Sequence, residues 1–244
     1  MDEIEQTIKN GDTFLQKDKF MDSIREYTRA YEVMKEDNGD KAELCYKLSQ
    51  AYYALEPKNP ENSGRFGKES LAIHEKLKET DMIVMDYLNL GYIYMDAKKL
   101  EESEQFFSSA IKKADEAEDP VLFSMSLNAL GELYSKWKGK TGKALEIYNK
   151  VIEISGEVED WDNYFEAMRG KVSLEREKDP DKAFELSMEA LDFIDKICSK
   201  TKNKKDRKDL RKSLDFMYDL ASDMAMEKED VDLAMKIAQR LNSE

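Results

Sequence analysis

A helical pattern of apolar and small residues occurs twice along the chain, over residues 83–115 and 123–155. Both copies carry leucine, glycine and tyrosine at matching positions near their start, and a small residue followed by an aromatic one further on. The matched residues are Leu90, Gly91, Tyr94, Ser103 and Phe107 in the first copy, and Leu130, Gly131, Tyr134, Ala144 and Tyr148 in the second. Because a unit this short cannot bury its own apolar stripe, the copies must stack against one another as a solenoid.

Further copies emerge when the small residue inside the first helix of each hairpin serves as a marker. The markers are Gly11, Ser49, Gly91, Gly131, Gly170 and Ser222, and a second small residue follows each of them at Ser23, Gly67, Ser103, Ala144, Ala183 and Ala234. The sequence thus predicts twelve helices in six antiparallel hairpins, over residues 2–37, 40–79, 81–117, 119–157, 160–198 and 205–243. The last two markers are 52 residues apart, which indicates an inserted segment, and we expect a basic linker over residues 199–212.

Turn signals agree with these hairpins. Asp119-Pro120 and Asp179-Pro180 each place a capping carboxylate before a proline that suits the first position of a helix. Pro57 and Pro60 predict an enlarged turn inside the second hairpin. The segment Gly139-Lys140-Thr141 resembles the end of a phosphate-binding loop, but it lacks the upstream glycine and joins two predicted helices, so we interpret it as a turn.

The Leu-Gly-x-x-Tyr pattern, followed by alanine, then phenylalanine or tyrosine, then alanine, resembles the tetratricopeptide repeat. Its period near 40 residues is similar to the long-helix versions in kinesin light chains, mitotic-spindle adaptor proteins and bacterial peptide-sensing regulators. The resemblance implies an all-α, right-handed superhelical solenoid that forms one domain over residues 1–244. It also implies that the first helix of each hairpin lines a concave groove, where such proteins hold an extended peptide or a partner's helix.

Composition narrows the function classes. The net charge is −14 and 38% of the residues are charged, so the protein repels nucleic acid and anionic membranes and attracts basic partners. The acidic N-terminal segment is unlike a signal peptide, and no apolar run reaches membrane-spanning length, so we expect a cytoplasmic protein. Cys45, Cys198 and the single histidine, His74, provide neither metal-ligand spacing nor a nucleophile–base pair. We therefore expect no cofactor, no metal and no enzymatic activity; His74 and Cys45 are expected to pack between helices.

The predicted groove face lies opposite the packing stripe of the first helices. Tyrosine and methionine are unusual on exposed helix surface, and such apolar patches commonly mark interaction sites. The predicted partner-binding residues are Tyr46, Gln50, Tyr53, Met85, Leu88, Tyr92, Met95, Met125, Asn128 and Glu132. The alternative is that some of them pack helix against helix between repeats.

The same face is acidic when it is followed through all the hairpins. Lys136 and Lys171 are its only bases, against nine acids: Glu5, Asp12, Glu43, Asp96, Glu132, Glu175, Asp219, Asp223 and Glu227. This bias favours a basic or amphipathic peptide as the partner. It argues against the repeats that clamp the acidic tail of heat-shock chaperones, because Asp12 and Lys47 stand where that clamp expects asparagine.

The segment from Lys200 to Lys212 reverses the charge of the chain, with eight bases against Asp206 and Asp209. A solvated linker or helix extension is one interpretation. The other is a docking patch for an acidic partner or for another copy of the chain, centred on Lys204, Lys205, Arg207 and Lys208.

The function predicted from these features is a non-catalytic adaptor or scaffold that binds a basic or amphipathic peptide segment of another protein in its groove. Two alternatives remain open. One is a regulatory sensor whose shape changes when a peptide binds, and the other is a self-assembling structural subunit that forms homo-oligomers. The identity of the partner does not follow from the sequence, because groove residues vary without altering the repeat framework.

Overall fold

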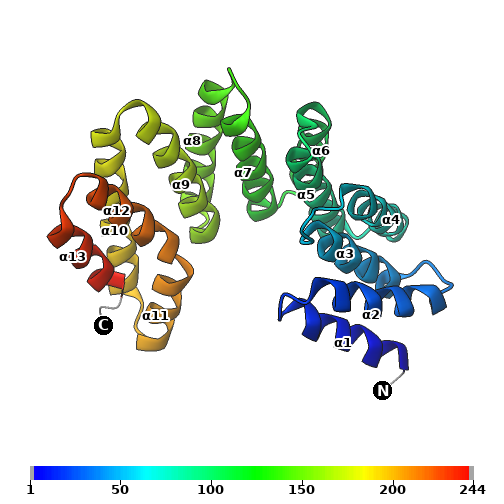
Figure 1. Ribbon diagram of the computed structural model, residues 1–244. Helices are drawn as coiled ribbons and strands as arrows, with labels where there is room; N and C mark the ends of the chain where they lie inside the picture. The colour runs from blue at the N-terminus through cyan, green and yellow to red at the C-terminus, as the bar shows by residue number, and fades with distance from the viewer. Residues whose placement is uncertain (1–2, 242–244) are drawn as a thin grey trace. The chain divides into compact units, whose positions relative to one another are not determined.

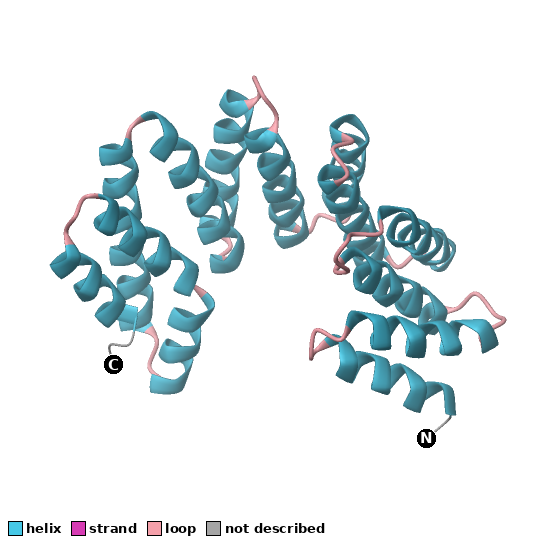
Figure 2. Cartoon of the chain, in the orientation of Figure 1, coloured by secondary structure: helices cyan, strands magenta, loops and turns pink. Residues whose placement is uncertain are grey.

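The computed structural model describes residues 3–241, and within that range it contains thirteen α-helices and no strand. Most of the connections between helices are short turns (Figure 2). The helices are α1 (Glu3–Leu15), α2 (Phe20–Val33), α3 (Gly39–Tyr53), α4 (Pro60–Leu77), α5 (Thr80–Asp96), α6 (Leu100–Glu116), α7 (Pro120–Lys136), α8 (Thr141–Glu157), α9 (Trp161–Lys178), α10 (Pro180–Lys200), α11 (Lys204–Ser213), α12 (Asp215–Glu227) and α13 (Val231–Leu241).

The chain divides into two compact units, Met1–Ala129 and Leu130–Glu244, and the boundary falls inside α7. In the N-terminal unit, α1 packs with α2, α3 with α4, and α5 with α6, as successive antiparallel hairpins (Figure 1). The second helices α2 and α4 also pack on the first helices that follow them, α3 and α5. In the C-terminal unit, α8 packs on α9, α9 on α10, α10 on α12, and α12 on α13. The helical hairpins predicted from the repeat are therefore confirmed.

Close helix crossings explain why glycine recurs in the first helices. A β-carbon added to Gly11 would overlap the ring of Tyr27, and one added to Gly91 would overlap the ring of Phe107. In the C-terminal unit, a β-carbon on Gly131 would likewise meet the ring of Tyr148, at 2.7 Å. Each ring therefore occupies the space that a side chain on the facing helix would need. The glycine and the aromatic residue of the repeat therefore pack against each other across the hairpin.

The helices begin where the capping residues and prolines of the sequence predict. Asp119 Oδ1 accepts a hydrogen bond from the backbone N–H of Leu122, and Asp179 Oδ1 accepts one from that of Lys182. Pro60 begins α4 instead of lying inside the preceding turn. The turn between α7 and α8 contains Gly139 at φ +87°, which confirms that this segment is a turn.

The prediction of twelve helices and a basic linker over residues 199–212 is corrected by α11, a thirteenth helix within the described residues. This helix is fixed on one side, because Leu210 packs against the core of the C-terminal unit and the Arg211 guanidinium pairs with Asp195 of α10 at 3.0 Å. The long spacing before the last hairpin is therefore an additional helix. Separately, none of the helices in residues 3–241 has both the length and the apolar character needed to cross a bilayer.

Candidate functional site: an acidic groove in the N-terminal unit

Two hollows lie next to each other along α3. The larger, of about 780 Å³, lies between α3 and the start of α5, and the smaller, of about 600 Å³, lies between α1 and α3. Glu43 and Lys47 line both of them, so the two hollows adjoin, and together we call them the groove. The first helices of the hairpins supply most of its walls.

The groove combines acidic and apolar side chains. Six carboxylates line it against two lysines: Glu5, Asp12, Asp40, Glu43, Glu79 and Asp81 against Lys9 and Lys47. Its apolar lining consists of Ile4, Ile8, Met34, Leu44, Tyr46 and Met82. Such a surface suits a ligand that carries both apolar and positively charged groups.

Asp12 is the centre of a hydrogen-bond network under the smaller hollow. Its carboxylate accepts a hydrogen bond of 2.7 Å from the Tyr27 hydroxyl and pairs with the Lys47 ammonium at 3.0 Å. Lys47 also pairs with Glu43 at 3.0 Å. Asp12 and Lys47 thus hold α1, α2 and α3 together. Because the Lys47 ammonium is already paired with two carboxylates, it does little to neutralise the other carboxylates of the groove.

The predicted partner-binding residues divide into three groups. Tyr46 and Gln50 line the larger hollow. Leu88 and Met95 are only 4% and 3% exposed, so their expected place on the groove face is corrected: they pack between helices, as the alternative interpretation held. The others are partly buried, namely Tyr53, Met85, Tyr92, Met125, Asn128 and Glu132, and the last of these belongs to the C-terminal unit, where it pairs with Lys136.

Two predicted groove tyrosines have structural contacts. The Tyr53 hydroxyl donates a hydrogen bond of 2.6 Å to Asp96, which also binds Lys58, so α3 is joined to the end of α5. The Tyr92 ring packs edge-on against Phe107, with 5.2 Å between ring centroids. These side chains therefore contribute to folding as well as to the surface. Among the acids predicted to face the groove, Glu175 is instead buried and pairs with Lys182 at 3.2 Å. The expectation that it faces solvent is therefore wrong.

His74 packs between helices, as expected, but its partner was not predicted. Its Nδ1 lies 2.6 Å from Oδ2 of Asp86, which is fully buried on α5. Other residues that sequence reasoning missed lie at the start of α5, where Glu79, Asp81 and Met82 form one wall of the larger hollow. The position of these residues in the sequence could have indicated them, because the first turn of a groove-lining helix faces the same groove as the centre of that helix. Cys45 is buried, and burial raises the pKa of its thiol to about 12, in keeping with an inert packing role.

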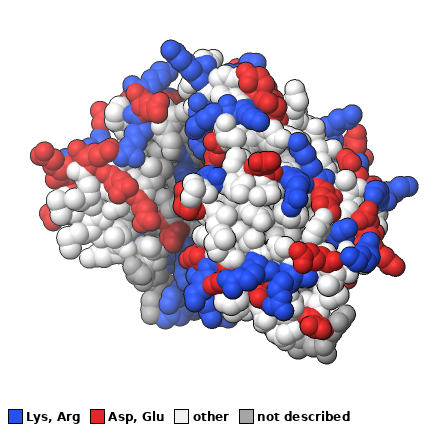
Figure 3. Space-filling model, turned by 45° about the vertical axis from the view of Figure 1, so that its right-hand side comes forward, with Lys and Arg blue, Asp and Glu red and all other residues white. Residues whose placement is uncertain are grey.

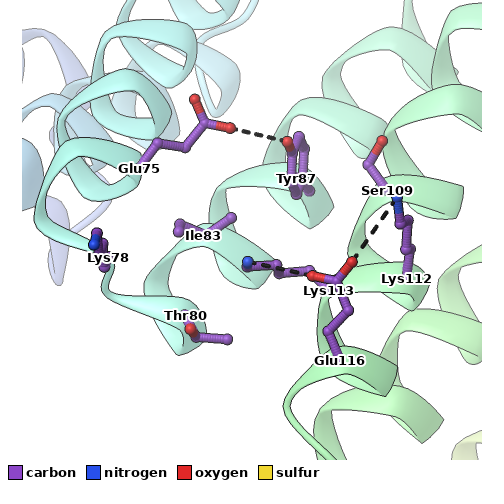
Figure 4. A pocket seen from close by; sticks show the side chains of 9 residues that line it. All are labelled: Glu75, Lys78, Thr80, Ile83, Tyr87, Ser109, Lys112, Lys113 and Glu116. Carbon is purple, nitrogen blue, oxygen red and sulfur yellow. Dashed lines mark hydrogen bonds and ion pairs between the residues drawn. The ribbon is translucent and has the colours of Figure 1, made fainter.

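A third hollow, of about 610 Å³, lies among α4, α5 and α6 and involves none of the predicted groove residues (Figure 4). Ile83 and Tyr87 lie between the two sets of charged residues in it. The Tyr87 hydroxyl donates a hydrogen bond to Glu75, and Glu116 pairs with Lys113 at 3.4 Å and with Lys112 at 3.9 Å. Because its charges are largely compensated internally, this hollow has less to attract a charged ligand than the groove.

The basic segment forms a stripe on α11. Lys205, Lys208 and Lys212 are exposed, recur at helical spacing on one face, and have no carboxylate partner among the described residues. Lys204 and Lys208 of the predicted docking patch are exposed, whereas Arg207 is partly buried and donates a hydrogen bond to the carbonyl of Thr201. On the face in Figure 3, basic and acidic side chains are interspersed with uncharged surface.

Comparisons with known proteins agree with the fold. No protein-family model matches the sequence. Regulatory protein RapD of Bacillus subtilis (strain 168) is 30% identical over 113 residues, which make up 46% of this chain and 31% of that protein. The chain thus matches less than a third of the length of this curated relative.

Solved structures match over more of the chain. The apo form of RapI superimposes with a TM-score of 0.65 at 16% identity, covering 98% of this chain and 96% of RapI. The Podosopora anserina kinesin light chain TPR-like repeats give a TM-score of 0.61 at 13% identity, with 76% and 93% covered. The Rap conjugation gene regulator of plasmid pLS20, in complex with the Phr* peptide, gives 0.56 at 15% identity, with 96% and 71% covered. With its stacked hairpins and these likenesses, the chain has the fold of tetratricopeptide-type helical repeats.

Proposed function

We propose that this protein binds an extended basic peptide segment along the groove of its N-terminal unit and acts through that binding as a regulator or adaptor. The observation that carries the proposal is the pair of adjoining hollows along α3, with their six carboxylates and their apolar lining. Apolar side chains of the peptide bind Tyr46, Ile8 and their neighbours, while the carboxylates select partners with positive charge.

The names of similar proteins favour a regulatory role over a passive scaffold. The curated relative is named a regulatory protein, and one similar structure is a gene regulator in complex with a peptide. At these levels of identity and coverage the likeness extends to the fold, so the peptide-binding role of this chain rests on its own groove.

Selection from a random heptapeptide library displayed on phage tests the proposal. The full chain is immobilised, and the charge-reversed variant Glu5→Lys/Asp81→Lys serves as the parallel target. We expect peptides rich in arginine or lysine with one or two apolar residues to be enriched on the natural chain and not on the variant. Enrichment of acidic peptides, or equal enrichment on both targets, contradicts the proposal.

A sensor and a scaffold differ in their response to the bound peptide. A ligand shifts a conformational equilibrium only when it binds one state more tightly than the other. Small-angle X-ray scattering of the full chain, with and without a selected peptide, distinguishes the two roles. A changed scattering profile supports the sensor, and an unchanged profile supports the scaffold.

Self-assembly is a second candidate, favoured by the stripe of Lys205, Lys208 and Lys212, which has no carboxylate partner within residues 3–241, in a chain of net charge −14. The stripe would contact an acidic surface of another copy. Light scattering should then give a mass above one chain at low salt and a lower mass as salt screens the contact. A single-chain mass at low salt and high concentration excludes this candidate.

A further inference from the structure

The larger hollow of the groove contains a buried imidazole with one unused nitrogen. His74 is 1% exposed and lines the hollow from α4. Its Nδ1 lies 2.6 Å from Asp86, whereas Nε2 lies 3.7 Å from Oε2 of Glu79, beyond hydrogen-bonding distance. Within residues 3–241, Nε2 makes no hydrogen bond. Since Asp86 does not line the hollow and Glu79 does, Nε2 is the ring nitrogen directed towards it.

The contact with Asp86 fixes what Nε2 offers. A carboxylate accepts a hydrogen bond, so the neutral ring carries its proton on Nδ1 and donates it to Asp86. Nε2 then has a lone pair and acts as an acceptor. Because His74 lines the hollow, a ligand in the hollow that carries an N–H group can donate a hydrogen bond to Nε2.

Two carboxylates near this nitrogen lack cationic partners. Glu79 and Asp81 are exposed at the start of α5, and neither pairs with a lysine or arginine among the described residues. Lys47, on the opposite wall, is already paired with Asp12 and Glu43. The wall formed by His74, Glu79 and Asp81 therefore offers hydrogen-bond acceptors and negative charge, with Tyr46 and Met82 as apolar surface beside them.

We propose that this wall is a guanidinium subsite, which receives one arginine side chain of the bound peptide: Nε2 of His74 and the Glu79 and Asp81 carboxylates accept its N–H groups, and its aliphatic stem lies on Tyr46 and Met82. A guanidinium fits better than an ammonium, because it presents five N–H donors in a fixed planar fork and is less strongly hydrated. This subsite rests on the proposed function, since it defines one position of the peptide.

Because His74 is the only histidine, an imidazole nitrogen NMR spectrum of the full chain reports on this subsite alone. The probes are N-butylguanidinium and its neutral isostere N-butylurea, added at equal ionic strength and at the same pH. We expect N-butylguanidinium to shift the Nε2 resonance in a saturable way, and N-butylurea to leave it in place. An Nε2 resonance that stays fixed, or that shifts equally with both probes, overturns the proposal.

Variants of exposed residues test the carboxylates without disturbing the buried pair. Glu79→Gln/Asp81→Asn should weaken N-butylguanidinium binding at least about tenfold. The matched control, Glu101→Gln/Glu102→Gln in the first turn of α6, should leave it unchanged. Equal affinities in the two variants contradict the subsite.

A peptide pair separates this proposal from the proposed function. A phage-selected peptide and its copy with citrulline in place of arginine are compared by calorimetry on the full chain. Tighter binding of the arginine peptide, with a shifted Nε2 resonance, supports both. Equal affinity of the two peptides overturns the subsite and leaves the peptide-binding function standing. An N-butylguanidinium response without any peptide binding supports the subsite and overturns the function.

Discussion

The carboxylate of Asp86 lies 2.6 Å from Nδ1 of His74, and these two residues are 0% and 1% exposed. The contact joins α4 to α5 underneath the larger hollow. The second carboxylate oxygen of Asp86, Oδ1, has no hydrogen-bond partner within the described residues. Burial raises the pKa of Asp86 to about 6, against the opposing effect of the His74 hydrogen bond. Hydrogen bonds from His74 and Ser70 thus offset only part of the cost of forming this buried charge.

This pair predicts a pH dependence of stability. The pKa of Asp86 is higher in the folded than in the unfolded chain, so the folded state binds more protons between the two values. The contribution of Asp86 is therefore most favourable below about pH 4 and is lost as the pH rises through about 6, by an amount on the order of 2 kcal/mol. We expect the unfolding free energy of the natural chain, relative to Asp86→Asn, to fall between about pH 4 and pH 7.

Urea unfolding followed by circular dichroism measures this difference. Tryptophan fluorescence does not suit it, because Trp137 and Trp161 both lie in the C-terminal unit. Asp81→Asn, on the exposed start of the same helix, is the control and should run parallel to the natural chain. A natural chain that becomes more stable than Asp86→Asn as the pH rises would contradict the raised pKa of the Asp86 carboxyl.

Gly91 and Gly64 make a matched pair for testing the close crossings. The β-carbon of Gly91→Ala would overlap the Phe107 ring, whereas that of Gly64→Ala would lie 3.9 Å from Tyr94. We expect Gly91→Ala to lower the unfolding free energy by about 1–3 kcal/mol through overpacking, and Gly64→Ala to raise it by up to about 1 kcal/mol through helix propensity. Thermal melting compares the two, and equal midpoints would mean that the hairpin contacts are misplaced.

Asp195 secures two helices of the C-terminal unit on α10. It pairs with Arg211 of α11 at 3.0 Å and with Arg240 of α13 at 2.8 Å, and Arg211 is only 8% exposed. Asp195→Asn should cost about 2 kcal/mol, because a nearly buried guanidinium loses its counter-charge. Asp192→Asn, whose exposed side chain also pairs with Arg240, should cost less than about 1 kcal/mol. Urea unfolding followed by tryptophan fluorescence gives both values, and equal costs would rule out this anchoring role.

The acidic groove predicts a salt-dependent association rate. Reversing Glu5 and Asp81 to lysine should slow the association of a phage-selected basic peptide and flatten its dependence on salt, because exposed charges act mainly through long-range attraction. Glu101→Lys/Glu102→Lys on α6 changes the net charge equally and should have a smaller effect. Stopped-flow kinetics at several salt concentrations decides between them, and identical slopes for both variants would place the attraction elsewhere.

The repeat made most of the fold predictable. Gly91 and Phe107 were both recognisable from the sequence as recurring positions of the repeat. Their contact across the hairpin is seen only in the structure. Helix α11 was not predicted, because its charged composition is typical of a solvated linker. Leu210 and Arg211 contact the rest of the C-terminal unit on its packed side. Single apolar anchors of this kind leave no periodic signal.

The groove was predictable in position and charge but not in detail. Glu5, Asp12, Glu43, Tyr46 and Gln50 line it as expected. Leu88 and Met95 do not line it, because neighbouring helices cover them. Which side of a first helix is covered depends on how the neighbouring helices stack, and the apolar periodicity of one helix carries no information about that. The His74–Asp86 pair depends on a contact between two helices, and a single histidine offers no motif from which to predict it.

Hydrogen–deuterium exchange of the full chain, with and without a phage-selected basic peptide, tests most directly whether the groove binds peptide. We predict slower exchange on binding in α1, α3 and the first turns of α5, which line the groove. The exposed turns of α6, which border the third hollow among α4, α5 and α6, should keep the same exchange rates when the peptide binds. Protection confined to α2, α4 and α6, or to residues 130–241, would contradict a peptide-binding groove along the first helices.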